Sequence, residues 1–147
     1  MTDYEILKST DVSSNKLLSE ILNFEKYSEF LPQIQEIVIL EKSPGIIKTK
    51  EIILLKSIFK KQIIQESIHE FNENSIRSKI ISGPAKNSIL EIIFSNTDIG
   101  CTVNLKADLQ LGLKGKLLQP IISKYFKMYA NGLLNKIITN TKLEEDK

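Results

Sequence analysis

The strongest constraint on this chain is a repeating alternation of apolar-rich segments and short turns between residues 34 and 111. Isoleucine recurs throughout these segments, and its β-branched side chain favours strands. Residues that preset or tolerate turn dihedrals separate the segments: Ser43-Pro44-Gly45, Asn72-Glu73-Asn74, Gly83-Pro84 and Asn96-Thr97-Asp98. Connections this short join antiparallel neighbours. The pattern therefore predicts a meander with strands over residues 34–42, 46–57, 58–71, 75–82, 88–95 and 101–111, the break at Ser57 being the weakest.

The last of these segments has the most regular pattern. Val103, Leu105 and Ala107 alternate with Thr102, Asn104 and other polar residues. Because successive side chains of a strand point to opposite faces, one face of the sheet is expected to be buried and the other solvated.

The N-terminal part predicts one strand followed by two short helices. Residues 4–10 form the expected strand, and the run from Asp11 to Ser14 supplies oxygens that can cap the first turn of a helix. Apolar residues then recur at helical spacing up to Leu22. A second helical piece over residues 24–30 ends before Leu31-Pro32, since a residue that precedes proline is pushed out of the helical region.

A long helix is predicted from Leu117 or Leu118 to about Thr141, with a frayed tail over residues 143–147. Its apolar pairs recur every four positions, so the apolar stripe winds around the helix axis. Either a curved sheet that grips the helix or a dimer contact along one half explains this winding, and we favour the sheet. We expect the first half, residues 121–129, to line a cavity, and the second half, residues 133–138, to pack against the far end of the sheet or another chain.

Composition and charge exclude several classes of protein. The net charge is +2, from 20 basic and 18 acidic residues, which is too balanced for binding that relies on neutralising phosphates, so no nucleic-acid partner is expected. The first residues lack the pattern of a signal peptide, and no apolar run is long enough to span a membrane. The single Cys101 lies in an alternating apolar stretch and is expected to be a buried, reduced thiol. These features predict a cytoplasmic protein.

Groups that could carry chemistry are few. His69 is the only histidine; pointing outward it is solvated, and pointing inward it shares a face with Gln65, Ser67 and Phe71. No spacing typical of a metal site, a catalytic triad or a phosphate-binding loop occurs, and Gly112-Leu113-Lys114-Gly115-Lys116 lacks the spacing of a nucleotide-binding loop. We therefore expect no catalytic residues, no metal and no cofactor.

Three short motifs resemble one known superfamily. They are Leu22-Asn23-Phe24-Glu25-Lys26-Tyr27-Ser28-Glu29-Phe30-Leu31-Pro32, Ser82-Gly83-Pro84 and Gly100-Cys101-Thr102-Val103. Together they resemble the START-like (SRPBCC) superfamily, in particular its polyketide cyclase/dehydrase and coenzyme Q-binding branch, which includes a bacterial ribosome-association toxin. The chain differs from that pattern at Asn23, Ser28 and Ala85, and it has no tryptophan.

The order of elements and the resemblance imply the same fold. It is an α+β helix-grip fold, in which a curved antiparallel sheet of about seven strands surrounds a long C-terminal helix, with two short helices after the first strand. Residues 1–147 are expected to form a single START-like ligand-binding domain.

The expected function is binding or transport of a hydrophobic small molecule such as a lipid, a quinone or a polyketide-like compound, with transient contact to a membrane surface and a monomeric or homodimeric state. A cyclase or dehydratase that uses Glu51, His69 or a tyrosine for proton transfer, and a ribosome-binding or protein-interaction module, are the alternatives; an enzyme is less favoured because no catalytic set is visible. A ligand site is mostly apolar with a few placed polar groups. The candidate ligand contacts are Phe30, Glu51, Ser78, Ile80, Ile92, Phe94, Val103, Leu105, Ile122, Tyr125, Phe126 and Tyr129.

Overall fold

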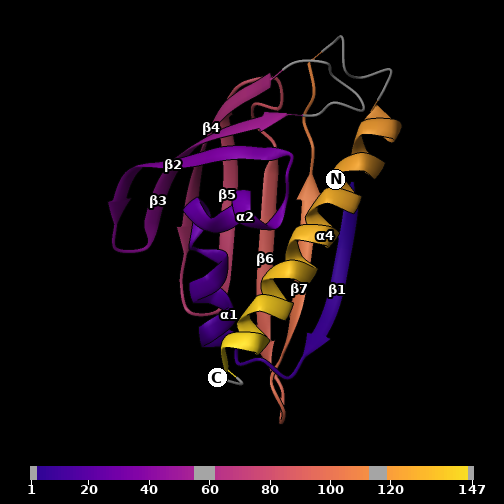
Figure 1. The fold of residues 1–147 in the computed structure, drawn as a ribbon. Helices are drawn as coiled ribbons and strands as arrows, with labels where there is room; N and C mark the ends of the chain where they lie inside the picture. Colours follow the sequence, from indigo (N-terminus) through magenta and orange to yellow (C-terminus); the bar gives the residue numbers. More distant parts are fainter. Residues whose placement is uncertain (1–2, 55–61, 113–118, 146–147) are drawn as a thin grey trace.

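The computed structural model describes residues 3–54, 62–112 and 119–145, without the side chains of residues 119–122, 125 and 145. One strand and three short helical segments come first, followed by six strands and a long helix (Figure 1). In chain order the elements are β1 (Tyr4–Thr10), α1 (Ser14–Ile21), η1 (Phe24–Lys26), α2 (Tyr27–Phe30), β2 (Ile34–Ser43), β3 (Ile46–Leu54), β4 (Gln62–Phe71), β5 (Ser75–Ser82), β6 (Ile89–Asn96), β7 (Cys101–Asp108) and α4 (Gln119–Glu145).

The strands form one seven-stranded antiparallel sheet in the order β1-β7-β6-β5-β4-β3-β2. From β2 to β7 each strand pairs with its successor, and β1 closes the order by pairing with β7. The chain therefore passes from one edge of the sheet to the other through α1, η1 and α2. Register shifts in β2 and between β4 and β5 mark bulges, which bend the strands and increase the curvature of the sheet. The predicted meander and the α+β helix-grip fold are confirmed.

The long helix α4 lies across the same face of the sheet as α1 and α2 (Figure 1). It contacts β1, α1 and α2. The core lies between this helical layer and the sheet, and it includes Leu17 and Ile21 of α1 together with Leu134 and Ile137 of α4. Their spacing of three or four residues places each pair on one face of its helix.

The turns and caps predicted from the sequence have identifiable contacts. Ser13 is the N-cap of α1, and its hydroxyl accepts a hydrogen bond from the Lys16 amide at 3.4 Å. Gly83 has a φ of +100°, and a Cβ at this position would lie 2.9 Å from the carbonyl oxygen of Ile64. At Gly100 a Cβ would lie 2.2 Å from the carbonyl oxygen of Thr10. Both glycines of the quoted motifs are therefore required by close backbone contacts.

Strands β2 and β6 differ from their predicted bounds by one residue. Two other predicted boundaries are wrong by several residues, and contacts between distant residues explain both. Strand β7 ends at Asp108 instead of residue 111, because the next amides leave the ladder: Leu109 donates to the Asp3 carboxylate at 2.6 Å and Gln110 donates to the Ser88 hydroxyl at 2.8 Å. Helix α4 continues past Thr141 to Glu145. The boundary proposed at Ser57 and the helix start proposed at residues 117–118 lie outside the described residues.

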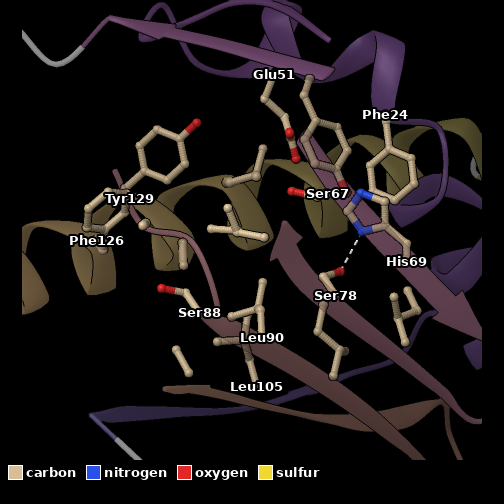
Figure 2. A pocket seen from close by; sticks show the side chains of 18 of the residues that line it. Phe24, Glu51, Ser67, His69, Ser78, Ser88, Leu90, Leu105, Phe126 and Tyr129 are labelled. Atoms are coloured by element: carbon tan, nitrogen blue, oxygen red, sulfur yellow. Dashed lines mark hydrogen bonds between the residues drawn. The ribbon is translucent and has the colours of Figure 1, made fainter. Parts of the chain in front are cut away.

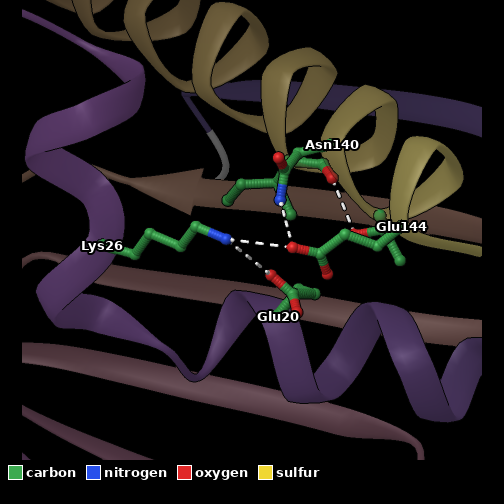
Figure 3. A network of polar contacts seen from close by, with 6 residues as sticks. Glu20, Lys26, Asn140 and Glu144 are labelled. Atoms are coloured by element: carbon green, nitrogen blue, oxygen red, sulfur yellow. Dashed lines mark hydrogen bonds and ion pairs between the residues drawn. The ribbon is translucent and has the colours of Figure 1, made fainter. Parts of the chain in front are cut away.

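Ion pairs hold the last turns of α4 against the N-terminal helices. The Lys26 ammonium lies 3.2 Å from Glu144 Oε1 and 3.9 Å from Glu20 Oε2, and Asn140 donates to the same Glu144 oxygen (Figure 3). Lys142 pairs with Asp11 at 3.1 Å. These contacts explain why the segment expected to fray is helical up to Glu145.

Candidate functional site

A cavity of about 200 Å³ lies between the sheet and α4. Most of its surface is apolar, and β6, β7 and α4 contribute Ile92, Leu105 and Leu133 to it. Tyr4, Tyr27 and Tyr129 also line it, and they come from three different elements. At this point the side chains of the sheet and of α4 leave space between them.

The polar side chains of the inner sheet face are concentrated on three neighbouring strands. We call this set the polar row; it consists of Thr49 and Glu51 on β3, Ser67 and His69 on β4, and Ser78 on β5. The strand register explains the grouping, because Thr49 is opposite Ser67 and His69 is opposite Ser78. Alternate residues of a strand share a face, so all five side chains point inward. All but Thr49, which is fully buried, line the cavity.

His69 occupies the centre of the polar row. Its Nε2 lies 2.8 Å from the Thr49 hydroxyl, and its Nδ1 lies 2.5 Å from the Ser78 hydroxyl (Figure 2). Phe24 of η1 stacks on the imidazole, with 4.1 Å between the ring centroids. Burial lowers the pKa of His69 to about 4. The ring is therefore neutral at pH 7, and each of its nitrogens has a hydroxyl partner.

Glu51 is the only carboxyl group among the described residues that line the cavity. Its side chain points into the interior beside Ser67 (Figure 2) and is 8% exposed. Burial raises the pKa of Glu51 to about 7, and the nearby charge of Glu66 acts in the same direction. Hydrogen bonds with the hydroxyls of Ser67 and Thr49 and with the backbone oppose this rise. Its Oε2 atom has no hydrogen-bond partner among the described residues.

The helical segments after β1 close one side of the site. Phe24 and Tyr27 line the cavity, and their ring centroids lie 5.5 Å apart. The Tyr27 hydroxyl donates to the carbonyl oxygen of Ile21, and burial raises the pKa of Tyr27 well above its ordinary value. This tyrosine is therefore un-ionised and held in place, and its ring contributes mainly surface to the cavity.

The structure brings together part of the residue set expected from the sequence. Seven of the twelve candidates line the cavity: Glu51, Ser78, Ile80, Ile92, Leu105, Phe126 and Tyr129. The side chains of Ile122 and Tyr125 lie outside the described residues. Phe126 and Tyr129 project from α4 on the side opposite His69 (Figure 2).

Three candidates lie elsewhere. Phe94 and Val103 pair with each other near the end of the sheet where α1 packs on β6, and both are buried in the core. Phe30 ends α2; its carbonyl oxygen accepts from Lys136 at 2.7 Å, and the Lys26 ammonium lies 5.9 Å from its ring centroid. The alternation of residues along the strands correctly placed Phe94 and Val103 on the inner face of the sheet. Helix α1 packs at this end of the sheet, so the two residues lie in the core and not at the cavity.

The expectation that only the first half of the long helix lines the cavity is wrong. Leu133, Leu134 and Ile137, all from its second half, are lining residues as well. The helix lies along the sheet (Figure 1), so its stripe follows the cavity for several turns. Helical periodicity shows which residues share a face of the helix, but it does not show how far along the helix the cavity extends.

Several lining residues were missing from the expected site: Phe24, Tyr27, Gln65, Ser67, His69 and Ser88. A signal for three of them was present, because Gln65, Ser67 and His69 alternate along one strand in phase with apolar positions. The inward orientation of His69 was one of the two readings of the sequence. For Phe24 and Tyr27 the sequence motif was recognised, but its position over the cavity depends on the chain crossing from β1 to β2.

Other sites have less support in the described residues. No group of three or more histidine, cysteine, aspartate or glutamate side chains there could hold a metal ion. Cys101 is buried and free, as expected from its position. No helix in the described part of the chain is both long and apolar enough to cross a membrane.

Comparison with known proteins adds evidence on the fold. No family model and no curated protein sequence matches the chain. Among solved structures, a protein from Thermus thermophilus superposes with a TM-score of 0.82 at 12% identity, over 95% of this chain and 97% of that one. The Zhui aromatase/cyclase from a Streptomyces species gives a TM-score of 0.76 at 10% identity, over 95% and 92% of the two chains.

A START superfamily protein from Mycobacterium smegmatis gives a TM-score of 0.67 at 12% identity, over 91% of this chain and 95% of that one. These similarities extend over nearly the whole chain, and they agree with the strand order and the long gripping helix described above. The chain has the helix-grip fold of the START-like superfamily.

Proposed function

We propose that this chain is a binding or carrier protein for a small hydrophobic molecule held between the sheet and α4. The observation that supports this most directly is the cavity of about 200 Å³ with polar groups on one side and apolar side chains elsewhere. An apolar cavity of about 150 Å³ accommodates benzene, so this one suits a molecule, or the head group of a larger one, with one or two rings. Glu51, Ser78, Phe126 and Tyr129 are the proposed ligand contacts.

Native mass spectrometry of protein purified without denaturation tests this proposal, together with titration of a neutral two-ring compound such as 2-methylnaphthalene. We expect bound mass or saturable binding. Ala130 lines the cavity, so Ala130→Phe should fill it and abolish binding. Met128 is 67% exposed on the same helix, and Met128→Phe is the matched control that should still bind. Ligand-free protein that binds no ring compound would overturn the proposal.

A second function, an enzyme of the cyclase or dehydratase type, is favoured by one observation. Glu51 lines the cavity with a pKa of about 7, so it can both accept and donate a proton near neutral pH. In a dehydration, ionised Glu51 would take the proton next to a ketone, and the electron pair of that C–H bond would form the C=C bond as the C–O bond breaks. The leaving hydroxyl would depart as water by taking the proton that Glu51 has accepted, which returns Glu51 to its ionised form.

The probe for this second function is 4-hydroxy-4-phenylbutan-2-one, whose dehydration product is followed by its ultraviolet absorbance. Catalysis by the unmodified protein that Glu51→Gln abolishes would support an enzyme. Binding of the probe without turnover would contradict the enzyme and would agree with the binding function.

A further inference from the structure

Most polar atoms of the polar row already have partners within the protein. The two ring nitrogens of His69 are engaged by Thr49 and Ser78. Ser88, the other cavity serine, accepts from the Gln110 amide at 2.8 Å and donates to the carbonyl oxygen of the same residue at 3.3 Å. A buried polar atom without a partner is costly, and Glu51 Oε2 is such an atom. The site therefore lacks one hydrogen bond, and a ligand can supply it.

The charges around Glu51 limit what that ligand can be. None of the described residues that line the cavity is a lysine or an arginine. The groups around Glu51 are Gln65, which is directly opposite it on β4, together with Thr49 on its own strand, Ser67 and His69 on β4, Tyr27 on α2 and Tyr129 on α4; Glu66 acts through its charge from the other face of β4. None of these carries a positive charge at pH 7. An anionic ligand would bury a second negative group beside Glu51 with no cation to stabilise it.

A protonated amine also fits poorly. An ammonium group carries three N–H donors and loses its hydration on entering the cavity, whereas the site offers one free carboxyl oxygen. A hydroxyl group carries one donor and needs one acceptor. Its hydration is also less costly to remove than that of a charged group.

We propose that the cavity selects a neutral molecule of one or two rings that carries a hydroxyl group, whose O–H donates to Glu51 Oε2. This inference rests on the proposed binding function and names its ligand class. The apolar lining receives the rings, while His69, fixed by its two hydroxyl partners and by Phe24, shapes the side of the subsite next to Glu51.

Three compounds of the same size test the inference at pH 8, where Glu51 is mostly ionised: 2-naphthol, 2-methylnaphthalene and 2-naphthoate. They differ in a single substituent, which is a hydroxyl, a methyl or a carboxylate group. We expect 2-naphthol to bind about tenfold more tightly than 2-methylnaphthalene, the effect of one well-placed buried hydrogen bond. We expect 2-naphthoate to bind more weakly than both.

Variants at Glu51 assign the preference to this side chain. Glu51→Leu should equalise the dissociation constants of 2-naphthol and 2-methylnaphthalene, and Glu51→Gln, which keeps the shape and an acceptor, should retain part of the difference. Glu66→Gln is the matched control: Glu66 lies on β4, pairs with Lys48 at 3.7 Å and does not line the cavity, so the preference should persist.

The outcomes separate this inference from the proposed function. If 2-methylnaphthalene binds the unmodified protein as tightly as 2-naphthol, the ligand class is wrong while the binding function stands. A preference for 2-naphthol that survives in Glu51→Leu also overturns the inference, because the hydroxyl must then be bound elsewhere. If none of the three compounds binds, the proposed function itself fails.

Discussion

The two halves of the sheet present different surfaces to the same cavity. Strands β3, β4 and β5 carry the polar row, whereas the half made by β6 and β7 presents the apolar wall, defined as Leu90, Ile92, Leu105 and Ala107. Both surfaces are inner faces of one continuous sheet, and both are largely buried. The difference therefore comes from side-chain chemistry alone and not from exposure.

This contrast indicates a division of roles. The apolar wall makes no directional contacts, so it contributes volume and hydrophobic stabilisation. Each group of the polar row needs a hydrogen-bond partner in a defined direction, and the row is therefore able to orient a ligand.

Moving a carboxyl group to the apolar wall should have the largest effect. Leu105 is 3% exposed on β7, and Leu105→Glu would bury a carboxyl group that has none of the hydroxyl partners available to Glu51. We expect a loss of about 4 kcal/mol in the free energy of unfolding, measured by urea denaturation at pH 8. Leu105→Met, which conserves volume, should cost less than about 1.5 kcal/mol. Equal losses for the two variants would contradict the contrast between the polar row and the apolar wall.

The pH dependence of stability should reveal two opposing contributions within the polar row. Burial raises the pKa of Glu51 from 4.5 to about 7 and lowers that of His69 from 6.5 to about 4. Near pH 5.5 the unfolded chain has ionised Glu51 and protonated His69, while the folded chain has protonated Glu51 and neutral His69. The two states then hold equal numbers of protons on this pair, so its contribution to the pH slope of stability is small.

Single variants should expose each contribution. With Glu51→Gln, only His69 remains; the unfolded state binds more protons between pH 4 and 6.5, so the free energy of unfolding should rise with pH across this window. With His69→Gln, only Glu51 remains, and the free energy of unfolding should fall between pH 4.5 and 7. Each change should be about 3 kcal/mol. Parallel pH profiles for the two variants would show that Glu51 and His69 do not make opposite contributions to the pH dependence of stability.

A smaller loss should follow from removing the shared hydroxyl of the row. Thr49 is fully buried and interacts with both Glu51 and His69. Thr49→Val keeps the shape but leaves a ring nitrogen of His69 without its partner, so we expect a loss of about 2 kcal/mol in thermal or urea unfolding. The equivalent isosteric change outside the row, Thr102→Val on the exposed face of β7, should have little effect.

The smallest effect is expected for a substitution outside both the polar row and the apolar wall. Lys26→Met removes the ion pairs that join η1 to α1 and α4 (Figure 3). Exposed ion pairs contribute little, so the urea midpoint should fall less than for the variants above, and the difference should vanish in roughly 1 M NaCl. A large loss that persists in salt would mean that the ends of the helices, and not the walls, dominate stability.

Local patterns were sufficient to predict most of the fold. Alternation and turn residues predicted the strands, and the cap at Ser13 and the Leu31-Pro32 pair bounded the helices. The end of β7 was out of reach, since it depends on the Asp3 side chain, which comes from the other end of the sequence. Register between strands is likewise non-local, and the hydrogen bonds of His69 to Thr49 and Ser78 follow from it.

The site was predictable only in part for the same reason. Glu51 and Ser78 were recognised because a polar residue in an apolar strand phase is conspicuous. Whether such a residue reaches a cavity depends on where the helices leave space, which explains why Phe94 and Val103 are not among the lining residues and why Phe24 is one of them. The contrast between the polar row and the apolar wall appears only once the strand order is known, because each surface is made by neighbouring strands.

The tyrosines found among the described lining residues make the occupancy of the cavity visible to spectroscopy. The chain has four tyrosines and no tryptophan, and Tyr4, Tyr27 and Tyr129 line the cavity. Their ultraviolet emission therefore has no tryptophan acceptor within the protein. A bound compound that absorbs near 300 nm would act as the acceptor instead and quench that emission. The unmodified chain thus carries an intrinsic fluorescent reporter for whatever enters its cavity.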